Sequence, residues 1–229
     1  MTFLKIFLIA GSMFFLQGEN ICFHLESRNL AKGKMIVVKA DVYYKFSEGK
    51  MITHYTYPAD YIIITNRKGE AQVYNPKTNT VFLKRGFLFS TDIDVVNLFL
   101  TERYFDMGLK DMNYKMINTK NDKGYVVTTW VPEKVSDEDA QKIEMAHQNS
   151  LPVYMALFDK NGKVSKKVYY SNYSSQGQYF IPIRVTEIAY IPNGDSVITK
   201  KEYADFKLGP AATGGYFNFA IPKDAKMTQ

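Results

Sequence analysis

The sequence predicts a mainly β protein with minor α content, built as one domain. Apolar and polar side chains alternate in several runs, turn-forming Gly, Asn and Pro clusters separate these runs at short spacing, and only two segments have helical signals. Short antiparallel strands at close spacing are typical of a barrel or a sandwich. The chain has 229 residues, is 46% apolar, and has no internal repeat or long linker, which favours a single domain.

The N-terminal residues have the pattern of a signal peptide. A short basic start with Lys5 precedes an apolar run over residues 6–16. A helix needs about 20 apolar residues to span a bilayer, so this run is too short for a membrane span. Gly18 is a small residue suited to the side that leaves on cleavage. We therefore expect a signal peptide over residues 1–18, export from the cytoplasm, and a mature domain over residues 19–229.

The cysteine and charge content restrict the remaining classes. Cys22 is the only cysteine, so no internal disulfide forms, and the residues before it lack the small and aliphatic pattern that lipidation requires. The net charge of +6, with 16 Phe and 17 Tyr, suits single-stranded nucleic acid in a cytoplasmic protein, but export argues against that partner. A basic exported protein is drawn to anionic membrane surfaces or acidic partners. Scattered lysines on a solvated face are the alternative explanation.

Residues 35–46 give the clearest strand. Its odd positions include Lys39 and Lys45, whereas its even positions are apolar, namely Ile36, Val38, Ala40, Val42, Tyr44 and Phe46. Because successive strand side chains point to opposite faces, the even positions form one apolar face. Residues 21–26 alternate in the same way, and the turn at residues 32–34 joins the two runs into a hairpin.

The same pattern continues along the chain. Residues 51–57, which include Tyr55 and Tyr57, form the next predicted strand, and Pro58 ends it. Residues 61–65 follow as a continuous apolar run with Ile62 and Ile64. Further strands are predicted over residues 71–74, 81–83, 125–131, 153–158, 164–170, 181–190, 197–206 and 217–221.

Two segments have helical signals. Thr91 and Asp94 form a start that resembles a capping box, and apolar residues follow almost all round the helix at residues 93–100. Such a helix must be covered on several sides, either as a lid over an apolar concavity or as a plain core helix on a sheet. The second signal is Ser136 with Asp139 three residues later, and it predicts a charged surface helix that reaches His147.

No residues are arranged for catalysis or for metal binding. The three histidines, His24, His54 and His147, are widely separated, so a zinc site is not expected. Cys22 and His24 share a strand face, but no third group beside them indicates a nucleophile. Glycines at residues 209–215 have a tyrosine where a phosphate loop needs lysine. The sequence therefore predicts no enzyme, no metal and no cofactor.

Several stretches resemble the outer-membrane lipoprotein carrier (LolA-like) superfamily. They include an aromatic strand with a lysine, an aromatic strand that ends in proline, a glycine turn and an aromatic turn with proline; the matching stretches are residues 23–28, 42–46, 51–58, 64–69, 73–81, 182–184, 203–206 and 217–222. This likeness covers most of the mature chain. It rests on a loose pattern without a catalytic motif.

The resemblance implies an incomplete antiparallel β-barrel with helices covering the concave face. Members of this family carry lipoprotein acyl chains across the periplasm, so the expected partners are such chains or another lipid, an inner-membrane release complex and an outer-membrane acceptor, with the protein itself a monomer. The candidate wall and lid of the lipid site are Val38, Val42, Tyr44, Phe46, Tyr55, Tyr57, Ile62, Ile64, Val96, Phe99 and Leu100.

The chain departs from the carriers at Phe46. Carriers have an arginine at this position that helps to hold the lid. The lid is therefore expected to be held by apolar packing of Val96, Phe99 and Leu100. The alternative functions are a general lipid-binding or envelope-stress-sensing module of the same fold and, third, a structural interaction protein of another β class.

Overall fold

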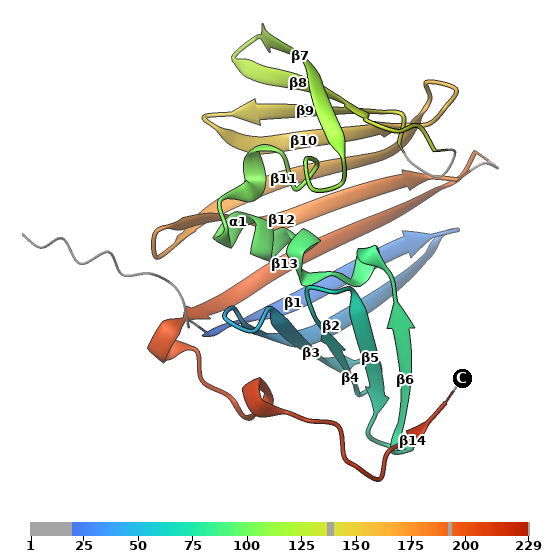
Figure 1. The fold of residues 1–229 in the computed structure, drawn as a ribbon, viewed down its shortest axis with the longest axis vertical. Coiled ribbons are helices and arrows are strands. Elements are labelled where there is room, and N and C mark those ends of the chain that lie inside the picture. The colour runs from blue at the N-terminus through green and yellow to red at the C-terminus, as the bar shows by residue number, and fades with distance from the viewer. Residues whose placement is uncertain (1–19, 137–139, 192–193, 229) are drawn as a thin grey trace, which may run out of the picture.

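The computed structural model describes residues 20–136, 140–191 and 194–228, and these form one large sheet (Figure 1). The predicted signal peptide lies outside the described residues. The strands are β1 (Asn20–Ala31), β2 (Lys34–Lys45), β3 (Lys50–Tyr57), β4 (Tyr61–Thr65), β5 (Glu70–Asn75), β6 (Thr80–Arg85), β7 (Tyr114–Asp122), β8 (Tyr125–Pro132), β9 (Lys142–Gln148), β10 (Leu151–Phe158), β11 (Val164–Gln176), β12 (Tyr179–Tyr190), β13 (Ser196–Leu208) and β14 (Lys226–Met227).

The sheet consists of two antiparallel meanders joined side by side. Its order is β14-β6-β5-β4-β3-β2-β1-β13-β12-β11-β10-β9-β8-β7. The first meander runs from β1 to β6 and the second from β7 to β13, and the pairing of β1 with β13 connects them. Within the described residues no pairing joins β14 to β7, so the sheet does not close. The prediction of an incomplete antiparallel barrel is confirmed.

The β1–β2 hairpin has the predicted turn and register. Lys32 and Gly33 both have positive φ angles, 49° and 70°, as a tight hairpin turn requires. Val42 and Tyr44 are buried in the main core, whereas Tyr43 between them packs into a second cluster on the other face. The alternation predicted for β2 is therefore confirmed. We call the face with Val42 concave and the face with Tyr43 convex.

The segment from residue 86 to residue 113 crosses the concave face (green in Figure 1). It contains the short helices η1 (Phe87–Phe89), η2 (Thr91–Ile93), α1 (Val95–Leu100) and η3 (Arg103–Phe105). Asp94 caps α1, since its Oδ1 accepts hydrogen bonds from the backbone N–H groups of Val96 at 2.9 Å and Asn97 at 3.3 Å. Five of the six α1 residues are buried, which agrees with the helix predicted to be covered on several sides.

The convex face has its own cover. Isoleucines 52, 62 and 64 form a second core there with Tyr74 and Val81. Residues of the C-terminal segment, including Tyr216, Phe219 and Ile221, pack on this core. The segment then runs to β6, where β14 adds a short parallel pairing (red in Figure 1).

Two sequence predictions of secondary structure were wrong, and one strand was missed. The surface helix expected from Ser136 to His147 is instead strand β9 at its C-terminal part, because Ile143, Met145 and His147 alternate inward; residues 137–139 lie outside the described part. The last predicted strand, residues 217–221, includes the end of η5 (Gly215–Asn218) and no strand, since its rings pack on the sheet face. Strand β7 was missed because eight of its nine residues are exposed and it is mostly polar.

Candidate functional site

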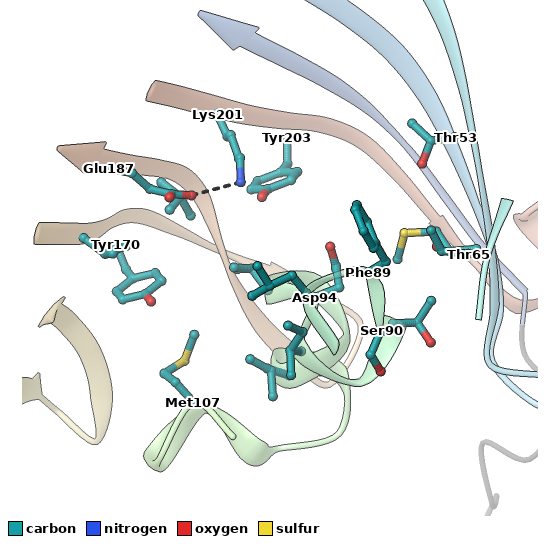
Figure 2. A pocket seen from close by; sticks show the side chains of 18 of the residues that line it. Thr53, Thr65, Phe89, Ser90, Asp94, Met107, Tyr170, Glu187, Lys201 and Tyr203 are labelled. Carbon is teal, nitrogen blue, oxygen red and sulfur yellow. Dashed lines mark hydrogen bonds and ion pairs between the residues drawn. The ribbon is translucent and has the colours of Figure 1, made fainter. Parts of the chain in front are cut away.

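The concave face and the segment above it enclose a cavity of about 580 Å³ (Figure 2). This volume lies within the range of about 300–1,000 Å³ that is usual for small-molecule sites. The lining side chains come from both meanders and from the crossing segment, and they are Met51, Thr53, Tyr55, Ile63, Thr65, Leu88, Phe89, Ser90, Thr91, Ile93, Asp94, Val95, Leu98, Met107, Met112, Met155, Lys166, Val168, Tyr170, Val185, Glu187, Lys201 and Tyr203.

Most of this lining is apolar. Strands β3 and β4 contribute Met51 and Ile63 from neighbouring strands of the first meander. The crossing segment contributes Leu98 and two methionines, Met107 and Met112. Methionine side chains are flexible and fill irregular space, so they suit contacts with an apolar ligand of variable shape.

Neutral hydrogen bonds fix the crossing segment to the first meander. The Thr91 hydroxyl donates to the carbonyl oxygen of Gly49 at 2.9 Å, and the Ser90 hydroxyl donates to that of Arg67 at 2.8 Å. The Tyr44 hydroxyl donates to Asn97 Oδ1 at 2.9 Å inside the core. The predicted packing of Val96, Phe99 and Leu100 is present, but these bonds hold the segment as well.

One wall of the cavity is charged. Lys166 on β11 and Lys201 on β13 lie on either side of Glu187 on β12, with N–O distances of 2.6 Å and 2.9 Å respectively. Burial alone would raise the pKa of Glu187, but the two ammonium groups outweigh it and hold this pKa below the ordinary glutamate value. Glu187 is therefore ionised at neutral pH. Figure 2 shows Glu187 and Lys201 on the sheet, beside Tyr203.

The tyrosines of the cavity stay neutral. Burial raises the pKa of Tyr55 to about 12, and it raises those of Tyr170 and Tyr203 further. Burial also raises the pKa of the Asp94 carboxyl, which the Asn97 and Val96 N–H groups and Lys201 act against. Apart from the lysine–glutamate cluster and Asp94, the lining thus carries no charge.

Comparison with known proteins identifies the architecture. The sequence matches no protein-family model and no curated protein. In structure the chain is similar to a LolA superfamily protein from Nitrosomonas europaea, with a TM-score of 0.57 and 15% identity over 88% of this chain and 93% of that one. The fold is LolA-like.

Two further solved structures are similar to this LolA-like fold. One is a putative outer membrane lipoprotein-sorting protein domain from Vibrio parahaemolyticus, with a TM-score of 0.58 and 13% identity over 88% of this chain and 90% of that one. The other is a DUF1329 family protein from Desulfovibrio piger, with a TM-score of 0.60 and 15% identity over the same shares. The sequence-based resemblance to this superfamily is thus matched by the fold.

The LolA-like fold places the predicted site residues in different environments. Tyr55 lines the cavity. Val42, Tyr44, Val96, Phe99 and Leu100 are buried in the concave core, with Phe46 partly buried against it, and none of these six lines the cavity. They form the packing that supports the cavity and its cover.

Four other predicted residues lie away from the cavity. Ile62 and Ile64 point to the convex core, because the cavity side of β4 is formed by Ile63 and Thr65. Because residues 61–65 are apolar at every position but the last, the sequence does not show which of them face the cavity and which face the convex core. Both faces of this strand are covered. Val38 is half-buried, and Tyr57 is 54% exposed near the end of β3.

The sequence analysis did not predict the cavity-lining residues that come from the second meander. Lys166, Val168 and Tyr170 alternate along β11, and Lys201 and Tyr203 do so along β13. The alternation was visible, but a lysine or glutamate on a strand is ordinarily assigned to the solvent face. The pairing of β11, β12 and β13 brings these side chains onto the concave face together.

Cys22 and His24 lie together on the convex face, away from the cavity. His24 is paired through Nδ1 with Asp41 and lies 3.7 Å through Nε2 from Asp205, close to Cys22 on the convex face. Burial raises the pKa of the Cys22 thiol, which disfavours the thiolate form. Within the described ranges, no three His, Cys, Asp or Glu residues are grouped as metal ligands, and no helix is long and apolar enough to cross a membrane.

Proposed function

We propose that this protein is a periplasmic carrier that binds lipid acyl chains in the cavity between the crossing segment and the concave face, and that it moves lipoproteins towards the outer membrane. The observation that supports this proposal best is the largely apolar 580 Å³ cavity of the LolA-like fold. One of the structures with a similar fold is the putative outer membrane lipoprotein-sorting protein domain from Vibrio parahaemolyticus. In this function the protein is not an enzyme.

Hydrophobic transfer supplies the driving force. Each methylene removed from water contributes about 0.8 kcal/mol, so a single acyl chain gains several kcal/mol by lying against Met51, Ile63 and Leu98. A carrier must also release its cargo. When the crossing segment lifts, the hydroxyl groups of Ser90 and Thr91 and their carbonyl partners form hydrogen bonds to water instead. Breaking these neutral bonds costs less free energy than separating a buried charge from its partner.

A general lipid-binding module is the second candidate function. The cluster of Lys166, Glu187 and Lys201 favours it, since charged side chains inside the cavity suit the polar headgroup of a free amphiphile. Mass spectrometry of the apolar material that copurifies from envelope extracts separates the two. Lipopeptide acyl chains support the shuttle, and a free lipid supports the general module.

The cavity itself is tested by placing a charge on its apolar wall. Ile63→Asp is expected to weaken binding of a fluorescent fatty acid at least about tenfold, because a carboxylate beside the acyl chain loses its hydration. Leu83→Asp is the matched control, since Leu83 is 40% exposed on the convex side of β6, which β5 separates from β4. Equal affinity of folded Ile63→Asp and parent protein in the titration would contradict the proposal.

The tip of the crossing segment is suited to a membrane surface. Leu88 is 85% exposed between Phe87 and Phe89, and Leu88 and Phe89 also line the cavity. Lys84 and Arg85 precede this apolar tip. Basic residues near an anionic bilayer each contribute about 1 kcal/mol to attraction. We therefore propose that residues 87–89 form the mouth of the cavity and make the transient membrane contact.

Leu88→Ser is expected to reduce sedimentation with anionic phospholipid vesicles about tenfold, because a buried leucine contributes about 1.5–3 kcal/mol. Met35→Ser, at the distant β1–β2 turn and 63% exposed, serves as the control and should leave vesicle binding unchanged. A similar loss in both variants, or in neither, would argue against a contact at the mouth.

A further inference from the structure

The charged side chains on one wall of the cavity indicate which kind of ligand headgroup the cavity can bind. Two lysines and one glutamate are expensive to place beside apolar surface unless their charges are used or fully compensated. Lys166 and Lys201 reach the cavity from β11 and β13, and both bond to the single carboxylate of Glu187 on β12 between them. The three side chains together carry an excess of one positive charge.

The ammonium groups also have donors to spare for a ligand. Each ammonium has three N–H donors. Lys201 uses one on Glu187 Oε1, and Lys166 approaches Glu187 Oε2. The side chains of Lys166 and Lys201 are 38% and 33% exposed, so their remaining donors are accessible to a group that enters the cavity. An anionic oxygen is the acceptor that best satisfies such donors.

The second carboxyl of the cavity is already engaged. Asp94 lies across from the cluster on the crossing segment (Figure 2), and its Oδ1 accepts the N–H groups of Val96 and Asn97 as the helix cap. These N–H groups hold the carboxyl at the start of α1, whereas the ion pairs of Lys166 and Lys201 are made with Glu187.

Apolar lining adjoins the charged wall. Val168 neighbours Glu187 across the β11–β12 pair, and Met107 and Leu98 lie on the crossing segment on the other side of the cavity. Figure 2 shows Met107 apart from the Glu187 and Lys201 pair, with Tyr170 between them. The cavity thus has a cationic wall and an apolar remainder, which is the distribution that an amphiphile needs.

We propose that the cavity takes an amphiphile with an anionic headgroup, a carboxylate or phosphate ester, which lies against Lys166 and Lys201 while its acyl chain occupies the apolar remainder. This inference rests on the second candidate function, the general lipid-binding module, and adds the class of headgroup. Each lysine donates hydrogen bonds to headgroup oxygens. Glu187 holds both ammonium groups at the wall in the absence of ligand.

The test measures displacement of a neutral hydrophobic dye by amphiphiles with the same dodecyl chain, below their micelle concentrations. The competitors are dodecyl phosphate, dodecanoate, dodecanol and dodecyltrimethylammonium, with inorganic phosphate alone as a further arm. The two anionic competitors are expected to bind about tenfold tighter than dodecanol, as one charge-assisted hydrogen bond would give. The cationic competitor is expected to bind more weakly than dodecanol, and inorganic phosphate should not displace the dye.

Two pairs of variants localise the effect. Lys201→Met and Lys166→Met keep an apolar stem but remove the ammonium, and each should lower the preference for anionic over neutral competitors about tenfold. Lys200→Met and Lys167→Met alter the adjacent residues of the same strands, which point to the opposite face, and should leave that preference unchanged. Thermal unfolding of all four variants verifies that they are folded.

The outcomes distinguish this inference from the proposed function. Displacement by dodecyl phosphate and dodecanol with equal affinity, a preference for the cationic competitor, or an equal effect of the control variants would each overturn the headgroup assignment. In these cases the apolar cavity would still bind lipid chains. Failure of every dodecyl compound to displace the dye or bind directly by calorimetry would instead overturn both proposals.

Discussion

Replacing Phe99 by aspartate is expected to lower the free energy of unfolding by about 4 kcal/mol or more, which is at the upper end for single substitutions. Phe99 is 1% exposed and stacks on Tyr104 with ring centroids 5.2 Å apart, and it also contacts the rings of Tyr170 and Tyr173. A carboxylate among these rings loses its hydration in apolar surroundings and leaves an aromatic-sized gap. Urea unfolding followed by tryptophan fluorescence measures the change.

Phe99→Leu is the control, because it keeps an apolar side chain of similar volume and should cost about 1.5 kcal/mol or less. Since Phe99 does not line the cavity, lipid binding by Phe99→Asp should fall only in proportion to the fraction of protein that unfolds. A Phe99→Asp protein as stable as Phe99→Leu would mean that α1 is not packed as described.

Glu187→Gln is expected to lower the free energy of unfolding by about 2–3 kcal/mol at neutral pH, because it leaves two ammonium groups close together without their shared counter-ion. The effect should depend on pH. The Lys201 and Lys166 charges outweigh desolvation and depress the Glu187 pKa in the folded state, so its contribution to stability is present above the unfolded value of 4.5. The contribution is lost as the pH falls through the folded pKa, and the variant and parent then converge.

Glu202→Gln provides the matched control for this change. Glu202 is the next residue on β13 after Lys201 and pairs with Arg184 at 2.7 Å, but its side chain is 38% exposed. Exposed ion pairs contribute about 0–1 kcal/mol, so this variant should unfold close to the parent at every pH. Urea unfolding at neutral pH and below pH 4.5 measures both variants, and equal destabilisation of the two would contradict a special role for Glu187.

The β meanders could be predicted because their signal is local. Alternation along β2 is enough to place Val42 and Tyr44 on one face, and the turn at Lys32 and Gly33 sets the hairpin register. Strand β9 was misassigned because the Ser136 capping signal and nearby charges outweighed the alternation of Ile143, Met145 and His147. In that segment the alternation of apolar and polar residues predicted the structure better than the capping signal, because pairing with neighbouring strands determines the conformation of short segments.

The cavity could be predicted only in part, because its composition depends on pairings between distant strands. Nothing local in the sequence distinguishes Lys166 and Lys201 from Lys167 and Lys200 beside them, which point to the opposite face of the sheet. The β11, β12 and β13 register brings the two inward lysines to either side of Glu187. Likewise, the assignment of Ile63 to the cavity and of Ile62 and Ile64 to the convex core depends on the C-terminal segment, which covers the convex face.

The C-terminal segment also affects the order in which the strands of the sheet can pair during folding. Strand β6 is synthesised well before the residues that form β14, yet in the described part of the chain its outer edge is paired by residues near the C-terminus, Lys226, Met227 and Thr228. Until then β6 presents an open edge, which is a template for unwanted pairing with another chain. Contacts so distant in sequence form late in folding. When β14 is added it covers this edge at Thr80 and Val81, the first two residues of β6.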